Sequence, residues 1–169
     1  MEICLTSWVG VNNADAYTIQ SNYWALKGLP HIQENVSFRE VWSLKVPKKA
    51  KVFRWKVLLD RLPTRVNLEC RGVGLSCNAC LLCNKEIESI QHLLITCKVA
   101  QRLWIKCDRW VGLTSVRVND IVNHFYSFHL VGLSKKANCV WKGMWLAITK
   151  AIWTHRNMII FNGGQVDEI

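Results

Sequence analysis

The sequence feature that most constrains this chain is a group of four side chains that can bind one metal ion. They are Cys80, Cys83, His92 and Cys97, in the spacing Cys-x2-Cys-x8-His-x4-Cys. Two cysteines three residues apart on a tight turn can present both thiolates to one ion. A histidine and a cysteine five residues apart, across a helical turn or its end, can complete a tetrahedron with Zn–S distances of about 2.3 Å and Zn–N distances of about 2.0 to 2.1 Å. Because four protein ligands leave no position for water or substrate, the spacing predicts one structural Zn²⁺ ion.

A further cysteine leaves open which two thiols form the first half of the metal site, that is, the register of the first half-site. Cys77, Cys80 and Cys83 form two overlapping Cys-x2-Cys pairs. We favour the pair Cys80 and Cys83 and expect Cys77 outside the shell. An iron–sulfur cluster is a competitor that the single histidine disfavours. The remaining cysteines and histidines carry no comparable signal, and we interpret them as core residues, surface residues or free thiols: Cys4, Cys70, Cys107, Cys139, His31, His124, His129 and His155.

Positive charge is concentrated in two blocks of the chain. The net charge is +10, from 22 Lys and Arg against 12 Asp and Glu. Residues 39–71 hold ten basic and three acidic side chains, and residues 98–156 hold ten basic and two acidic ones. A field of this sign attracts polyanions, of which nucleic acid is the first candidate and an acidic membrane surface the second. The charge therefore indicates RNA or DNA as a partner.

The chain shows no segment that would anchor it in a membrane. Its longest apolar stretches are far shorter than the roughly 18 residues of a membrane span. Met1 is not followed by a basic and then apolar leader. We therefore expect an intracellular protein without membrane contact, in a reducing compartment where clustered thiols bind metal before they form disulfides. The nucleus and the cytoplasm are not distinguished.

Hydrophobic spacing predicts a mainly α fold, a small helical domain with a zinc knuckle between helices. With 169 residues, of which 50% are hydrophobic, the chain can form a core of its own. A short N-terminal strand is expected at residues 17–19, and a helical C-terminal tail is expected to follow the knuckle. Four large apolar residues recur at steps of four, three and four and predict one buried stripe on the last helix: Trp141, Trp145, Ile148 and Ile152. Helices are expected after Ser21, Ser37, Pro47 and Thr64, from Ser89 through Trp110 to Gly112, over residues 118–128, and over residues 138–160.

The helix expected after Pro47 is amphipathic and strongly basic. Ala50, Phe53 and Val57 fall on one face at helical spacing. Five basic residues crowd the remaining surface, where they would face phosphates: Lys48, Lys49, Lys51, Arg54 and Lys56. The alternative is an ordinary solvated face, because lysine and arginine are common on exposed helices.

Several motifs, in this order, resemble the plant reverse-transcriptase zinc-binding domain. They are Tyr17-Thr18-Ile19, Val46-Pro47-Lys48-Lys49, Arg61-Leu62-Pro63-Thr64, Arg71-Gly72-Val73, the pair Cys80 and Cys83, His92-Leu93-Leu94, and Cys97. Leu81 stands where the family usually has proline, which removes no ligand. The resemblance implies a lead-in over residues 1–16, the zinc-binding domain over residues 17–104, and a helical tail over residues 105–169 ahead of a missing ribonuclease H region.

The resemblance also implies an accessory module of a non-LTR retrotransposon polyprotein, and not an enzyme. Polymerases and ribonuclease H need carboxylates that hold two metal ions about 3.5 to 4 Å apart, and the five Asp of this chain include no adjacent pair. A zinc deaminase needs a His-x-Glu motif, which is absent from the sequence. We expect weak, non-specific contact with RNA or DNA, contact with other parts of the parent polyprotein, and no small-molecule substrate. Two alternatives stay open: a protein-interaction scaffold that uses the Trp-rich last helix, and a non-functional fragment of the polyprotein.

Overall fold

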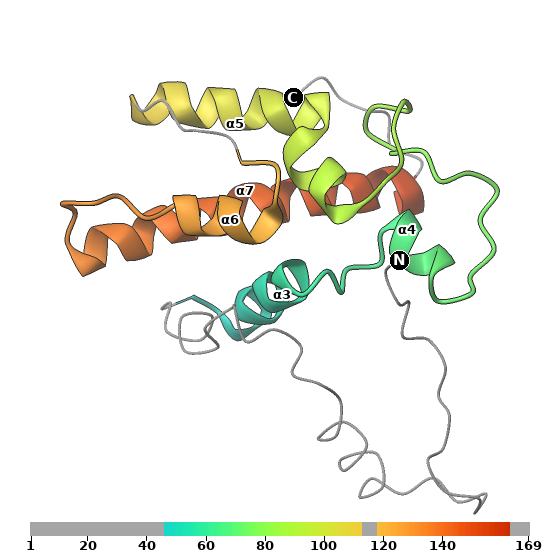
Figure 1. Ribbon diagram of the computed structural model, residues 1–169, viewed down its shortest axis with the longest axis horizontal. Coiled ribbons are helices and arrows are strands. Elements are labelled where there is room, and N and C mark those ends of the chain that lie inside the picture. The colour runs from blue at the N-terminus through green and yellow to red at the C-terminus, as the bar shows by residue number, and fades with distance from the viewer. Residues whose placement is uncertain (1–45, 113–117, 163–169) are drawn as a thin grey trace, which may run out of the picture.

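The computed structural model describes residues 46–112 and 118–162, and this part of the chain is mainly helical (Figure 1). The mainly α fold class is thus confirmed for it. The elements, in chain order, are α3 (Lys48–Leu58), α4 (Arg65–Glu69), the π-helical turn η1 (His92–Thr96), α5 (Lys98–Val111), α6 (Ile121–Ser127) and α7 (Lys135–Asn162).

Extended backbone plays a small part in the described residues. They contain no strand, and one isolated antiparallel bridge pairs Ala79 with Ile87. The strand expected at residues 17–19 and the helices expected after Ser21 and Ser37 lie outside the described residues.

Local sequence features determine where α3 and α4 begin. α3 begins directly after Pro47, whose missing N–H is no loss at a helix start. Asp60, just past its end, has a positive φ of 48° and turns the chain away. Thr64 then caps α4, since its hydroxyl oxygen accepts a hydrogen bond from the N–H of Asn67 at 3.3 Å. Both helix starts are those that the sequence predicts.

The prediction of a single helix from Ser89 to Gly112 is wrong, because the π-helical turn η1 and the separate helix α5 occupy this range. Ser89 caps the first turn as expected, with its Oγ accepting from the N–H of His92 at 3.1 Å. The N–H of Cys97 then donates to the carbonyl of His92 at 2.7 Å, which closes a π turn. Cys97 has a ψ of 135°, an extended value, so the helix cannot continue through it. α5 ends at Gly112, whose φ of 72° is the left-handed conformation that favours glycine.

The turn between α6 and α7 is closed by Asn138. α6 begins after Asp120, whose carboxylate accepts from the N–H of Asn123 at 2.8 Å. This cap explains why α6 is shorter than the expected 118–128. Oδ1 of the buried Asn138 accepts a hydrogen bond from the N–H of Leu130 at 2.8 Å, and Nδ2 of Asn138 donates to the carbonyl of Leu130 at 3.1 Å. α7 then runs for 28 residues and includes the helix expected over residues 138–160.

α7 is the central element of the arrangement. α5 packs on one side of it and α3 on the other, while η1 contacts both α5 and α7 (Figure 1).

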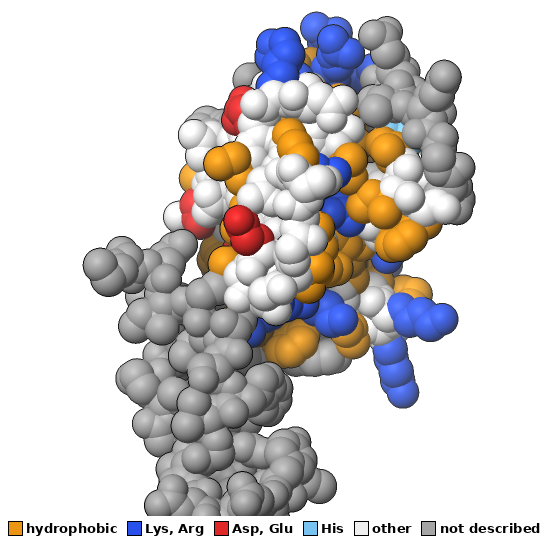
Figure 2. Space-filling model, turned by 90° about the vertical axis from the view of Figure 1, so that its right-hand side faces the viewer, with side chains coloured by type: hydrophobic (Ala, Val, Ile, Leu, Met, Phe, Trp, Pro, Cys, Tyr) orange, Lys and Arg blue, Asp and Glu red, His pale blue; other side chains and the backbone are white. Residues whose placement is uncertain are grey.

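In a view from the side, blue basic side chains gather at the top of the described part, at the level of α5, and at its lower end, at the level of α3 (Figure 2). No helix within residues 46–112 and 118–162 has the length and apolar character needed to cross a membrane.

The core forms where these helices meet. Trp145 and Ile152 of the predicted stripe are 0% and 1% exposed. Trp145 donates from Nε1 to Nδ1 of the buried His124 at 2.9 Å, and Trp104 packs edge-on against the same imidazole. His124 is therefore a core residue, as expected. The core takes apolar side chains from all of these elements except α4: Phe53, Val57, Leu58, Leu93, Leu94, Ala100, Trp104, Ile121, Phe125, Trp141, Trp145, Ile152 and Trp153.

We predict that Trp145→Ala lowers the free energy of unfolding by about 3 to 5 kcal/mol, because it removes a fully buried ring and leaves a cavity. Trp110→Ala is the matched control: this ring is 81% exposed, and its loss should change stability by less than about 0.5 kcal/mol. Urea unfolding of the zinc-loaded protein, followed by circular dichroism, measures both variants. Equal losses would contradict the packing described.

Candidate metal centre

The four side chains singled out by their spacing meet at one point. The Sγ atoms of Cys80, Cys83 and Cys97 and a ring nitrogen of His92 lie within 4.8 Å of one another. The Sγ atoms of Cys80 and Cys97 are 4.0 Å apart, and Sγ of Cys83 is 3.2 Å from Nε2 of His92. A tetrahedral zinc ion holds its sulfur and nitrogen ligands roughly 3.5 to 3.8 Å apart. The donor set therefore fits zinc with only small side-chain movements.

The cluster is enclosed by the protein. Cys80 and Cys97 are 0% exposed and His92 is 5% exposed, while Cys83 is half-buried. Three thiolates and one imidazole complete a tetrahedral shell. An ion held there cross-links the chain and has no position at which to activate water.

A tight turn positions the first two thiols. The N–H of Cys80 donates to the carbonyl of Glu86, and the N–H of Asn84 donates to the carbonyl of Cys80, both at 2.7 Å. Asn84 has a φ of 51°, a left-handed conformation that asparagine tolerates better than most residues. The chain reverses over these residues, which brings the Cys80 and Cys83 thiols to one side. The tight turn that lets two cysteines three residues apart face one ion is thus present.

The π turn places the other two ligand candidates together. In an α-helix, residues five positions apart point about 140° away from each other around the axis. In η1, the hydrogen bond from the N–H of Cys97 to the carbonyl of His92 closes the turn over five residues instead. Both side chains therefore lie on one side of the backbone. The break in the helix at Cys97 is the feature that makes His-x4-Cys a usable pair.

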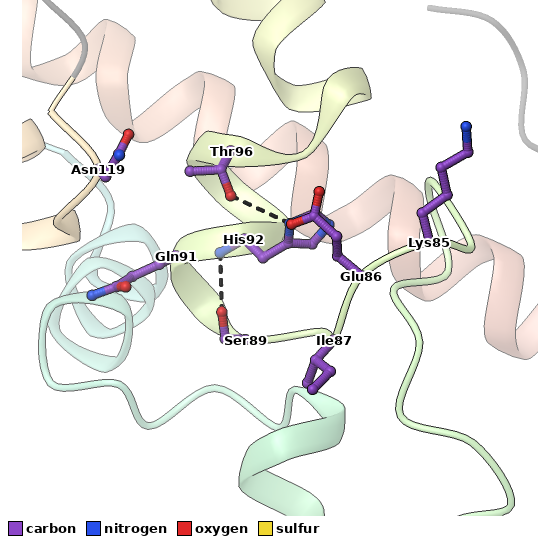
Figure 3. Close-up of a pocket in the computed structure, with 8 residues that line it drawn as sticks. All are labelled: Lys85, Glu86, Ile87, Ser89, Gln91, His92, Thr96 and Asn119. Atoms are coloured by element: carbon purple, nitrogen blue, oxygen red, sulfur yellow. Dashed lines mark hydrogen bonds and ion pairs between the residues drawn. The ribbon is translucent and has the colours of Figure 1, made fainter.

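The His92 ring is held from its outer side. Its Nδ1 lies 3.0 Å from Oε2 of Glu86 and 3.3 Å from Oγ1 of Thr96, while Nε2 faces Cys83. Figure 3 shows Glu86 and Thr96 beside the His92 ring, and all three residues line a pocket that none of the cysteines lines. A carboxylate on the outer nitrogen fixes the tautomer that leaves Nε2 free for metal. The sequence gives no signal for this role of Glu86, because the contact depends on how the loop folds.

The two buried thiols are hydrogen-bonded to each other. Cys80 donates to Cys97 over 4.0 Å. This hydrogen bond and burial raise the pKa of the Cys80 thiol well above its usual range, and the same bond lowers the pKa of Cys97. Zinc binds thiolates, so its binding must release the proton of Cys80. The apparent affinity for zinc should therefore increase with pH.

Cys77 lies outside the cluster. Its side chain is exposed, and its Sγ accepts a hydrogen bond from the N–H of Ala79 at 3.3 Å. The geometry therefore favours the register in which Cys80 and Cys83 form the first half-site.

A buried ion pair joins the segment between Cys80 and His92, which we call the metal-binding loop, to α7. Oε1 of Glu88 accepts hydrogen bonds from NH2 and Nε of Arg156, at 2.6 and 3.2 Å. Oε1 also accepts from the N–H of Arg65 at 3.1 Å, and Oε2 accepts from the N–H of Leu81 at 3.4 Å. Glu88 and Arg156 are 0% and 3% exposed. Sequence analysis missed this pair, since no local pattern connects residues 68 positions apart.

The basic residues of α3 divide into two groups. Arg54 is 0% exposed, and its guanidinium carbon lies 5.5 Å from the centroid of the Phe125 ring. The expectation that Arg54 faces phosphates is therefore wrong, because position 54 lies on the flank of α3 that packs against α6. The other four remain at the surface: Lys48, Lys49 and Lys56 are exposed and Lys51 is half-buried.

We predict that Cys83→Ser loses the stoichiometric zinc, whereas Cys77→Ser keeps one ion per chain. Only the first substitution removes a donor from the buried cluster. Elemental analysis of protein purified without added zinc measures the ion content. The reverse result would assign Cys77 to the shell.

We also predict that Arg156→Met lowers the free energy of unfolding by about 3 to 5 kcal/mol, because it leaves the Glu88 carboxylate buried without its cation. The variant should also lose zinc to a chelator faster than the wild type. The reason is that Glu88 accepts a hydrogen bond from the N–H of Leu81 and so holds the turn that carries Cys80 and Cys83, which we call the thiol turn. Lys136→Met, at an exposed position of the same helix, is the control. A destabilised Arg156→Met protein that released zinc at the wild-type rate would show that α7 does not support the metal site.

Comparison with known proteins agrees with this geometry. The family model described as zinc-binding in reverse transcriptase matches residues 17–104, just over half of the 169-residue chain. No curated protein and no solved structure matches the chain significantly. The matched range contains the whole Cys/His cluster, and together they support one zinc ion. The chain belongs to the family of zinc-binding domains of reverse transcriptase, which are accessory and not catalytic domains.

Proposed function

We propose that this chain is a structural zinc module that accompanies a reverse transcriptase and binds RNA or DNA weakly, without sequence preference, through α3. The observation that carries the nucleic-acid part is the row of surface lysines on α3, a helix without an acidic residue. The zinc part is supported by the buried donor set and by the family.

The metal would be held by the Sγ atoms of Cys80, Cys83 and Cys97 and by Nε2 of His92. Bound zinc supplies a cross-link between the thiol turn and η1. Residues 70–89, which lead into and form this turn, contain no regular helix and few buried apolar side chains. A segment of this kind takes much of its folding free energy from the ion.

The charge at the start of α3 also supports contact with a polyanion. Lys48 and Lys49 lie in the first turn, which has no acidic residue. The helix macrodipole is positive at this end, so two cations there destabilise the free helix by a few tenths of a kcal/mol each or more. A phosphate backbone beside this turn would relieve that repulsion.

The wider context that we propose is the polyprotein of a plant non-LTR retrotransposon, in which the module itself catalyses neither polymerisation nor ribonuclease H cleavage. The support is the resemblance of the tail motifs Ile152-Trp153, Arg156-Asn157 and Phe161-Asn162 to the region downstream of the zinc-binding domain in such polyproteins. Arg156 of this tail contacts the metal-binding loop, which is consistent with the two segments working together.

The alternative of an interaction scaffold loses its main argument. It relied on an available stripe of tryptophans along the last helix. In the structure, Trp141 and Trp145 are 8% and 0% exposed and pack against Phe128 and Phe125. These two tryptophans of the stripe therefore pack inside the fold.

We predict that the surface lysines of α3 contribute a slope of about −3 to −4 to the plot of log binding constant against log salt concentration, because each contact with a phosphate releases about one counterion. Replacing Lys48, Lys49 and Lys51 by Glu should weaken binding to all sequences alike and flatten the slope. Fluorescence anisotropy with labelled RNA and DNA of mixed sequence, at several salt concentrations, measures both quantities.

The triple variant should fold and keep its zinc, because Glu is also a good helix former. Circular dichroism and zinc content provide the control. A folded, zinc-loaded variant with the affinity and slope of the wild type would mean that α3 is an ordinary solvated face.

A further inference from the structure

A lysine of α7 lies directly beside the basic helix. Nζ of Lys150 is 4.7 Å from the centroid of the Phe53 ring of α3. The Lys150 side chain is nevertheless exposed, while Phe53 is 6% exposed. The ammonium group of Lys150 thus lies over the Phe53 ring, while the side chain as a whole remains accessible to a ligand. A cation over a ring in this way is attracted to its negative face, which favours one position of the side chain.

The exposed lysines of α3 lie around the same point. Lys49 and Lys56 are four residues before and three residues after Phe53, and residues at these spacings are neighbours on a helix surface. Both are exposed. Lys49 and Lys56 are therefore neighbours of Phe53 on α3, and Lys150 reaches the same ring from a helix almost 100 positions later in the chain. We call these three residues the lysine triangle.

No carboxylate on these helices opposes the lysine triangle. The ranges of α3, α6 and α7 contain no Asp and no Glu. Lys142 of α7 adds a further positive charge, 5.4 Å from the centroid of the Phe125 ring. The lower end of the described part in Figure 2 also shows blue side chains. Among the acidic residues of the described part, Asp60 follows α3, four residues after Lys56, and its Oδ1 accepts a hydrogen bond from Asn67 at 2.7 Å. The others lie on other segments: Glu69, Glu86, Glu88, Asp108 and Asp120.

We propose that the nucleic-acid surface is composite, with Lys150 of α7 contacting the same phosphodiester backbone as Lys49 and Lys56 of α3. This inference rests on the proposed function and extends it to a helix beyond the family match at residues 17–104. Lys49 and Lys56 are seven residues apart, about 10 Å along the helix, which corresponds to about three nucleotides of one strand at 3.4 Å each. The ligand is the phosphate backbone common to RNA and DNA.

The decisive variant is Lys150→Gln, which removes one charge from α7 and none from α3. If Lys150 contacts a phosphate, the salt slope should become less steep by about 0.7 to 0.9, with the smaller value for single strands. Lys150→Arg keeps the charge and the contact with Phe53, and it should keep the wild-type slope. RNA and DNA of the same mixed sequence are titrated separately, and both should respond to Lys150→Gln if the shared backbone is the ligand.

A control for the loss of positive charge elsewhere comes from α5. Lys98→Gln with Lys106→Gln removes two exposed charges on the other side of α7 and should leave the slope unchanged. Zinc content and circular dichroism verify the fold of each variant.

The outcomes separate the two proposals. If Lys49→Gln and Lys56→Gln flatten the slope but Lys150→Gln does not, the composite surface is wrong and the role of α3 stands. If none of these three variants, nor the triple variant of Lys48, Lys49 and Lys51, changes the slope, the nucleic-acid part of the proposed function fails as well. If the α5 control flattens the slope as much per charge as Lys150→Gln, binding follows net charge alone and the composite surface is again wrong.

Discussion

The buried contact between Glu88 and Arg156 is the interaction on which the rest of the structure depends. It connects the metal-binding loop to α7 across 68 positions of sequence. The same carboxylate holds the backbone N–H groups of Arg65, at the start of α4, and of Leu81, in the thiol turn. Two buried charges are costly to desolvate unless their polar atoms are well paired. Because Glu88 has donors on both oxygens, the pair can select one arrangement of these three segments.

The zinc site and this ion pair stabilise neighbouring parts of the same loop in different ways. A bound metal would act locally, since its ligand candidates lie in the thiol turn, in η1 and directly after η1. Glu88 lies between the thiol turn and η1 and directs the loop onto α7. η1 then presents Leu93 and Leu94 to the core, where both are fully buried. The candidate metal site and the packed helices are therefore connected through η1 and Glu88, although the family match ends at residue 104.

The positive charge of the chain serves two purposes. Arg54 and Arg156 are buried and contact aromatic rings, at Phe125 and Trp153. A guanidinium suits such positions, because it is planar and less strongly hydrated than an ammonium. The lysines of α3 remain at the surface, with their charge in water and their stems on the protein. The net charge of +10 thus overstates what is available to a polyanion.

The sequence by itself determined the features that depend on a few neighbouring residues. The Cys-x2-Cys and His-x4-Cys pairs, the caps at Thr64 and Ser89 and the tryptophan stripe of α7 all follow from local spacing, because turns and helical faces repeat over three to five residues. Only the tertiary structure decided that Arg54 is buried while its neighbours on α3 are not, that Glu88 pairs with Arg156, and that Lys150 lies over Phe53. Burial and ion pairing depend on which remote segment covers a side chain, and neither helical periodicity nor composition contains that information.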